Sequence, residues 1–140
     1  MKKLIALIGV AILMACTMIP GISFTEDQDT ILLARAIYAL ARDESYETKL
    51  AIGTVAMNRV ENVWFDSTLG DVLTQQHQFP LGARYDAESL SAAHDVLSGT
   101  RVLDENALYY RATDATESWD GQQPLKTIGG YAFYSENGNQ

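Results

Sequence analysis

The stretch LARAIYALARDESYETKLAIGTVAMNRV, residues 33–60, contains two apolar segments that flank a short charged one. The first segment begins just before this stretch, at Ile31, and ends at Ala41. It is apolar around nearly its whole circumference, which indicates a helix at the centre of a small domain. In the second, residues 46–62, apolar residues recur at helical spacing, and Ser45 is a suitable N-cap. The sequence therefore predicts a helical hairpin that turns at residues 43–45.

The pattern of the later residues changes from helical to strand-like. A short helix is expected at 69–76, an irregular stretch at 77–85 and a clearer helix at 86–98. The segments 107–112 and 127–135 are rich in aromatic and β-branched residues, and they predict two antiparallel strands joined by a long loop. Two adjacent glycines, Gly129 and Gly130, indicate a bulge or a close backbone approach in the final strand.

These elements predict a small α+β domain with a helical core and a C-terminal antiparallel β-hairpin. We expect the domain at residues 25–135 and a flexible tail at 136–140. A chain of 140 residues with 47% apolar residues has room for one such domain and a real core.

Residues 1–24 have the order of a secretory signal, because Lys2 and Lys3 precede an apolar run that ends near Pro20. Two alternatives are a lipoprotein signal, in which Cys16 becomes lipidated, and an uncleaved anchor. We expect export to the periplasm, the cell envelope or the extracellular space, with no integral-membrane role once the signal is removed.

The charge balance disfavours anionic partners. The formal net charge is −8, from 10 basic and 18 acidic residues, and removal of Lys2 and Lys3 makes it −10. Such a chain repels nucleic acid and anionic lipid at long range. One cysteine and two histidines give no disulfide and no metal-ligand spacing, so we expect no metal and no cofactor. We also expect a monomer.

Several ordered motifs point to one family. The run at residues 41–47 contains Ala41, Arg42, Glu44, Tyr46 and Glu47, and Asn58-Arg59-Val60 follows. The segments LGDVLTQQHQF (69–79), AAHDVLSG (92–99), ALYYRA (107–112) and TIGGYAFY (127–134) come later. Together they resemble the SleB/CwlJ family of bacterial and phage cell-wall hydrolases over about residues 30–135.

The resemblance implies a lysozyme-like or lytic-transglycosylase-like enzyme that cleaves the MurNAc-GlcNAc strand of peptidoglycan. In such enzymes a glutamate at the end of a buried helix protonates the glycosidic oxygen. This chain departs from the pattern because Leu40 occupies the position of that glutamate. Leucine cannot donate a proton, so either Glu44 acts as a displaced catalytic acid or the protein is an inactive wall-binding or regulatory relative.

The candidate substrate-binding residues are mostly aromatic, because sugars stack their apolar faces on rings. The alternative roles of Glu44 are to cap the second helix or to pair with Arg42, and most rings in so small a domain must serve the core. Peptidoglycan glycan strands are the expected partner. The expected binding residues are Tyr46, Gln78, Phe79, Tyr110 and Trp119.

Overall fold

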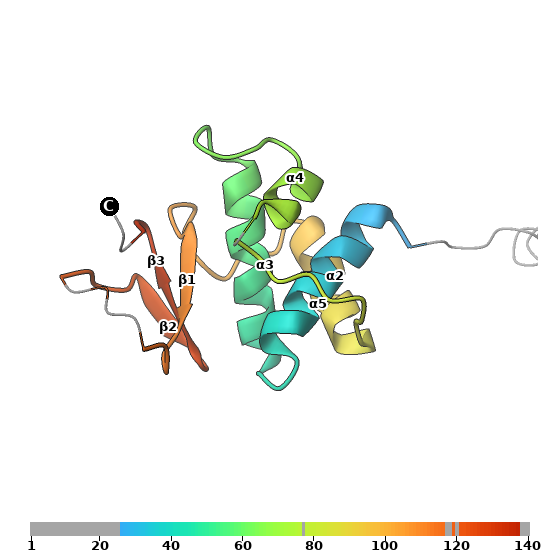
Figure 1. Cartoon of the computed structure of the whole chain (residues 1–140). Coiled ribbons are helices and arrows are strands. Elements are labelled where there is room, and N and C mark those ends of the chain that lie inside the picture. Colours follow the sequence, from blue (N-terminus) through green and yellow to red (C-terminus); the bar gives the residue numbers. More distant parts are fainter. Residues whose placement is uncertain (1–25, 77, 117–118, 120, 138–140) are drawn as a thin grey trace, which may run out of the picture.

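The computed structural model describes residues 26–76, 78–116, 119 and 121–137. Its helices are α2 (Gln28–Ala41), α3 (Tyr46–Val60), α4 (Leu69–Thr74) and α5 (Ala87–Leu97). Its strands are β1 (Tyr109–Ala112), β2 (Lys126–Ile128) and β3 (Tyr131–Tyr134). Figure 1 shows the helices gathered on one side and the small sheet on the other, with α3 next to the sheet.

The predicted helical hairpin is present. The Ser45 side chain accepts a hydrogen bond from the Thr48 N–H and caps α3, as expected. The α2 helix contacts α3, α4 and α5, and its residues Leu33 and Ile37 are fully buried. It begins at Gln28, three residues before the apolar pattern starts, because polar residues in a first turn carry no periodic signal.

Helix α5 packs closely against α3 at one glycine. A Cβ built on Gly53 would lie 2.8 Å from a methyl group of Val96, so the two helices approach more closely there than a larger residue allows. Both Gly53 and Val96 are fully buried. The α5 boundaries differ from the predicted 86–98 by one residue at each end, because Asp86 is the N-cap and Ser98 the C-cap.

The sheet corrects one prediction. Residues 127–135 were expected to form a single strand, but they form β2, a turn and β3, and the antiparallel strand order is β1-β3-β2. The turn consists of Gly129 and Gly130, between the paired residues Ile128 and Tyr131. Gly129 has a φ of +55°, a conformation that glycine adopts without strain. The glycines therefore reverse the chain instead of forming a bulge, while the predicted close approach is present, because a Cβ on either glycine would overlap the Glu44 carboxylate.

Buried polar side chains of α3 connect the helical part to the segments around it. Asn58 donates to the carbonyls of Asp104 and Ala107, at 2.8 and 3.0 Å. Lys49, with a side chain only 3% exposed, donates to Glu88 on α5 at 2.8 Å. These bonds fix the position of the chain before β1 and of α5 relative to α3, because a buried donor without a partner is costly.

The N-terminal expectations concern residues that lie outside the described part of the chain. The predicted signal at 1–24, with Cys16, and the end of the predicted tail at 138–140 are therefore expectations still. Among the residues that the structure describes, no helix has the length and apolar character needed to cross a membrane.

The close contact between α3 and α5 generates a stability prediction. Gly53→Ala gains up to about 1 kcal/mol of helix propensity but overpacks Val96, at a typical cost of about 1–3 kcal/mol. We expect a lower free energy of unfolding in urea. Gly70→Ala on α4 is the matched control, because its Cβ meets no atom within 4 Å, and it should leave stability unchanged or slightly raised.

Candidate active site

The C-terminal end of α2 meets the sheet at Leu40. The Leu40 side chain is half-buried against the core, and its carbonyl accepts a hydrogen bond of 2.6 Å from the hydroxyl of Tyr131 on β3. Tyr131 thus connects β3 to the C-terminal end of α2. The position at which the resemblance implies a catalytic glutamate lies at this junction.

Glu44 reaches the same junction from the turn between α2 and α3. Its Oε2 accepts a hydrogen bond of 3.2 Å from the N–H of Gly130. A Cβ on either Gly129 or Gly130 would overlap the Glu44 carboxylate, so the turn leaves room for it only because both residues are glycine. Glu44 is half-buried there, between the α2–α3 turn and the β2–β3 turn.

Tyr131 lies close to both the Leu40 carbonyl and the Glu44 carboxylate. Burial raises the pKa of its hydroxyl, and the negative charges of Glu44 and Asp114 raise the pKa further. The hydroxyl is therefore protonated at neutral pH and can donate to the Leu40 carbonyl. Tyr131 was not among the predicted site residues, although its place directly after two glycines in an aromatic segment is a usable signal.

The neighbouring carboxylates do not reach the junction in the same way. Asp43 is 91% exposed and lies 3.5 Å from Arg42, so Arg42 pairs with Asp43 and not with Glu44, which was one of the alternatives. Glu47 is 59% exposed and lies 3.9 Å from Lys126. Of the three acidic residues near the end of α2, Glu44 is the one held against the turn of the sheet.

A buried arginine, Arg59, lies in the last turn of α3. Arg59 donates to the Leu108 carbonyl at 2.7 Å and to Gln78 Oε1 at 2.9 Å. Its guanidinium carbon lies 5.0–5.3 Å from the ring centres of Phe65, Phe79 and Tyr109. Burial lowers its pKa, but arginine keeps its charge at neutral pH. Arg59 thus anchors the loop after α4.

Three of the predicted binding residues come together beside Arg59. The Tyr110 hydroxyl donates to the Gln78 carbonyl at 2.6 Å, and the Phe79 and Tyr110 rings are 5.3 Å apart. Tyr110 also contacts the ring of Tyr131 at 6.1 Å. The rings form a continuous series that leads to Leu40, and Phe79 within it belongs to the buried core. The polar groups of Gln78 that are named here already have protein partners.

The other two predicted binding residues lie elsewhere. The Tyr46 hydroxyl donates to Asp95 at 2.5 Å and contacts Ser91, so Tyr46 links α3 to α5. Trp119 packs on Tyr134 at 4.9 Å and beneath Arg111. Alternate residues of a strand face opposite sides, so Tyr134 and its partner Trp119 lie on the side of β3 opposite Tyr131.

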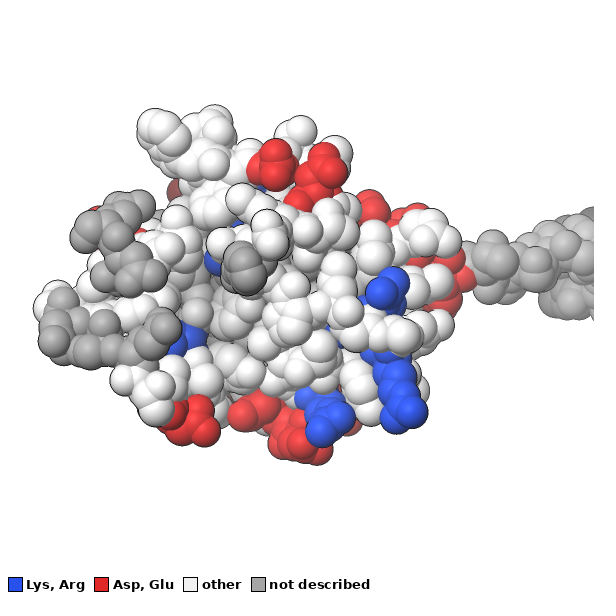
Figure 2. Space-filling view, viewed as in Figure 1, with Lys and Arg blue, Asp and Glu red and all other residues white. Residues whose placement is uncertain are grey.

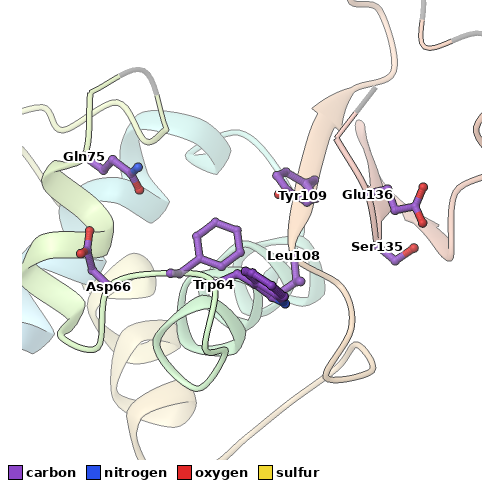
Figure 3. Close-up of a pocket in the computed structure, with 8 residues that line it drawn as sticks. Trp64, Asp66, Gln75, Leu108, Tyr109, Ser135 and Glu136 are labelled. Carbon is purple, nitrogen blue, oxygen red and sulfur yellow. The ribbon is translucent and has the colours of Figure 1, made fainter. Parts of the chain in front are cut away.

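A pocket of about 750 Å³ lies near the C-terminal end of α3, whereas Glu44 precedes the N-terminal end of the same helix. Figure 3 shows it between the α3–α4 loop and the ends of β1 and β3. The sequence patterns predicted neither this pocket nor a role for Trp64. Figure 2 shows acidic groups at the top, right and bottom margins of the visible face, basic groups at its lower right, and mostly uncharged groups between them.

The fold is that of the catalytic domains of two solved SleB structures. The catalytic domain of the Bacillus cereus SleB protein is 27% identical, with a TM-score of 0.68 over 80% of this chain and 94% of that one. The catalytic domain of the germination-specific lytic transglycosylase SleB from Bacillus anthracis is 26% identical, with a TM-score of 0.69 over 81% of this chain and 99% of that one. These matches confirm the expected small lysozyme-like α+β class.

The chain belongs to the Cell Wall Hydrolase family, whose sequence profile matches residues 43–134. The spore cortex-lytic enzyme of Bacillus subtilis is 34% identical over 114 residues, which cover 76% of this chain and 37% of that protein. The spore cortex-lytic enzyme of Oceanobacillus iheyensis is 33% identical over 112 residues, covering 75% and 41%. The chain thus spans about two fifths of the length of these curated relatives.

The fit of Glu44 beneath the glycine turn can be tested by a double-mutant cycle. Gly130 has no positive φ, so Gly130→Ala should perturb mainly the Glu44 carboxylate that its Cβ would overlap. We expect the loss of stability to be smaller by about 1–2 kcal/mol in a Glu44→Ala background, measured by urea unfolding. Additive effects within about 0.5 kcal/mol would contradict the contact.

The buried hydroxyl of Tyr110 predicts a loss of stability at alkaline pH. Burial raises its pKa from the ordinary 10.0 to about 12, so the unfolded chain loses this proton first as the pH rises. The stabilisation is complete below about pH 10 and is lost as the pH approaches about 12. Tyr110→Phe loses the hydrogen bond to the Gln78 carbonyl and should unfold more readily at neutral pH, but it should lose less stability between about pH 10 and about pH 12, as measured by denaturation at each pH. Equal pH slopes in the two proteins would contradict this.

Proposed function

We propose that this protein cleaves the glycan strand of peptidoglycan and that Glu44 is the proton donor. The observation that carries the proposal is the place of the Glu44 carboxylate, at the junction of Leu40, Tyr131 and the glycine turn, in a domain of the Cell Wall Hydrolase family. The names of the relatives, which describe a spore cortex-lytic enzyme and a lytic transglycosylase, support the same substrate class.

The chemistry requires a carboxyl group that can approach the glycosidic oxygen. Protonation of that oxygen by Glu44 allows the bond to the anomeric carbon to break, and an oxocarbenium-like centre develops. Water or the 6-hydroxyl of the same sugar then captures this centre and gives its proton to the Glu44 carboxylate, which yields hydrolysis or an anhydro sugar and restores the acid. Glu44 has to exchange its hydrogen bond with Gly130 for one to the substrate, and its place in a turn outside α2 makes that movement possible.

The displacement from position 40 to position 44 would be about one turn, or ~5.4 Å, on a continuous helix. Helix α2 ends at Ala41, however, so Glu44 does not extend the helix face that carries Leu40. It approaches the junction from the following turn, where the absence of two Cβ atoms provides space. This route supports Glu44 as a substitute for the glutamate that the resemblance implies at position 40.

The second candidate function is peptidoglycan binding without cleavage. Two observations favour it: Leu40 has no ionisable group, and Glu44 Oε2 already accepts the Gly130 N–H. Such a protein would still bind the glycan strand but would not cleave it.

The proposal includes export, because a cell-wall substrate lies outside the cytoplasm and residues 1–24 have the pattern of a secretory signal. We propose a monomer that acts on the wall glycan without a metal or cofactor. Its acidic charge disfavours nucleic acid and anionic lipid as partners.

Loss of turbidity of purified peptidoglycan tests the role of Glu44. The natural chain should lyse the wall, and Glu44→Gln should slow lysis by about 10²–10⁴-fold, because general acid catalysis typically contributes that much. Asp43→Asn is the matched control, since Asp43 is exposed and adjacent in sequence, and it should keep the natural rate.

Leu40→Glu separates the two candidate functions in the same assay. If the natural chain is inactive and Leu40→Glu creates lysis, the protein is a binder that has lost its acid. If Glu44→Gln lyses as fast as the natural chain, Glu44 is not the proton donor.

A further inference from the structure

The loop between α3 and α4 presents a tryptophan to solvent. Trp64 is 87% exposed and Val63 is 91% exposed, although large apolar side chains usually avoid water. The backbone here is ordered by local hydrogen bonds: the Trp64 N–H donates to Asn62 Oδ1 at 2.9 Å, and the Phe65 N–H donates to the Asn62 carbonyl at 3.2 Å. The indole is therefore held on a defined turn without being used by the core.

Trp64 forms part of the pocket of about 750 Å³ described above. Half of the lining residues are aromatic or aliphatic and half can form hydrogen bonds, a mixture typical of sites for small polar molecules with apolar faces. In Figure 3 the Trp64 and Leu108 side chains overlap in the view, and Gln75, the residue after α4, extends toward the pocket. The lining residues are Trp64, Phe65, Leu108 and Tyr109, with Asp66, Gln75, Ser135 and Glu136.

The pocket is connected to the candidate active site by aromatic contacts. Phe65 and Tyr109 lie 6.0 Å apart, and both contact the guanidinium of Arg59, which also lies over Phe79. From Phe79 the ring contacts continue through Tyr110 to Tyr131. Glu44 precedes α3 and Trp64 follows it, so the two sites are separated by about the length of this 15-residue helix, ~22 Å.

The charges around the pocket restrict its ligand. Asp66 and Glu136 line it, and the chain has a net charge of −8, so phosphate, carboxylate and anionic lipid groups are repelled. Carboxylates do accept hydrogen bonds from hydroxyl groups, and an exposed indole offers a flat apolar face. A neutral sugar provides both hydroxyl groups and an apolar face.

We infer that the Trp64 pocket is a distal binding site for a neutral N-acetylhexosamine unit of a glycan strand, with the Trp64 ring as the stacking platform. The inference rests on the proposed function, which makes the glycan strand the substrate. Phe79 and Arg59, between the two sites, are buried, so a strand that spans ~22 Å contacts the protein at the Glu44 junction and, several sugars away, at Trp64. Long strands then bind more tightly than short fragments, because only they reach both ends of α3.

Calorimetric titration with β-1,4-linked N-acetylglucosamine oligosaccharides tests the site. The protein carries Glu44→Gln so that no bond is cleaved during the titration, and the hexasaccharide and disaccharide are the probes. We expect Trp64→Ala to weaken hexasaccharide binding by about three- to tenfold, the typical effect of one aromatic contact, and Trp64→Phe to restore most of it. Val63→Ala is the matched control, because Val63 is equally exposed on the same loop but does not line the pocket.

Three results would overturn the inference. The first is equal hexasaccharide affinity with and without the Trp64 ring, and the second is an equal loss of affinity in Trp64→Ala and Val63→Ala. The third is a dimer in sedimentation that Trp64→Ala dissociates, because that result assigns the ring to contact between copies of the chain. A melting temperature unchanged by Trp64→Ala shows that the variant is folded, as the exposure of the side chain leads us to expect.

Failure of the distal site can be told apart from failure of the proposed function. If the natural chain lyses peptidoglycan but Trp64→Ala binds the hexasaccharide normally, only the distal site is wrong. If the natural chain lyses nothing and Trp64→Ala still weakens binding, the protein is a glycan binder and the distal site stands.

Discussion

The buried guanidinium of Arg59 joins the two halves of the molecule. Its hydrogen bonds are accepted by Leu108 and Gln78, from the segments on either side of α5, and its faces contact three aromatic rings. Within the described residues these oxygens and rings, rather than a carboxylate, compensate its charge. A buried charge requires such partners, so the loop at 78–79, the start of β1 and the Phe65 turn must all adopt positions that reach it.

Helix α3 gives this arrangement its direction. Its N-terminal end adjoins the junction of Glu44, Gly130 and Tyr131, and its C-terminal end supports Arg59 and the turn with Trp64. The aromatic side chains between these ends lie along one continuous path. The same helix that forms the core therefore also spaces the candidate acid and the exposed tryptophan.

The candidate site shows where sequence patterns stop being informative. The charged residues after α2 identified a turn, and Glu44 was selected from them by its spacing from Leu40. Its actual environment depends on Gly129 and Gly130, which are more than 80 residues away, and no local pattern connects a carboxylate to a distant glycine. Tyr46 and Trp119 were reasonable sugar contacts as aromatic residues, yet the fold uses one between helices and the other against Tyr134.

The sequence by itself determined the helical hairpin, the cap at Ser45, the α+β class and the family, because helical periodicity, capping and ordered motifs are local properties of the chain. Only the tertiary structure decided that the final aromatic segment turns back on itself, that Tyr131 meets the Leu40 carbonyl, and that Trp64 is left outside the core. The physical reason is that burial and hydrogen-bond partners are set by residues far apart in the chain, so they become fixed only when the helices and the sheet pack together.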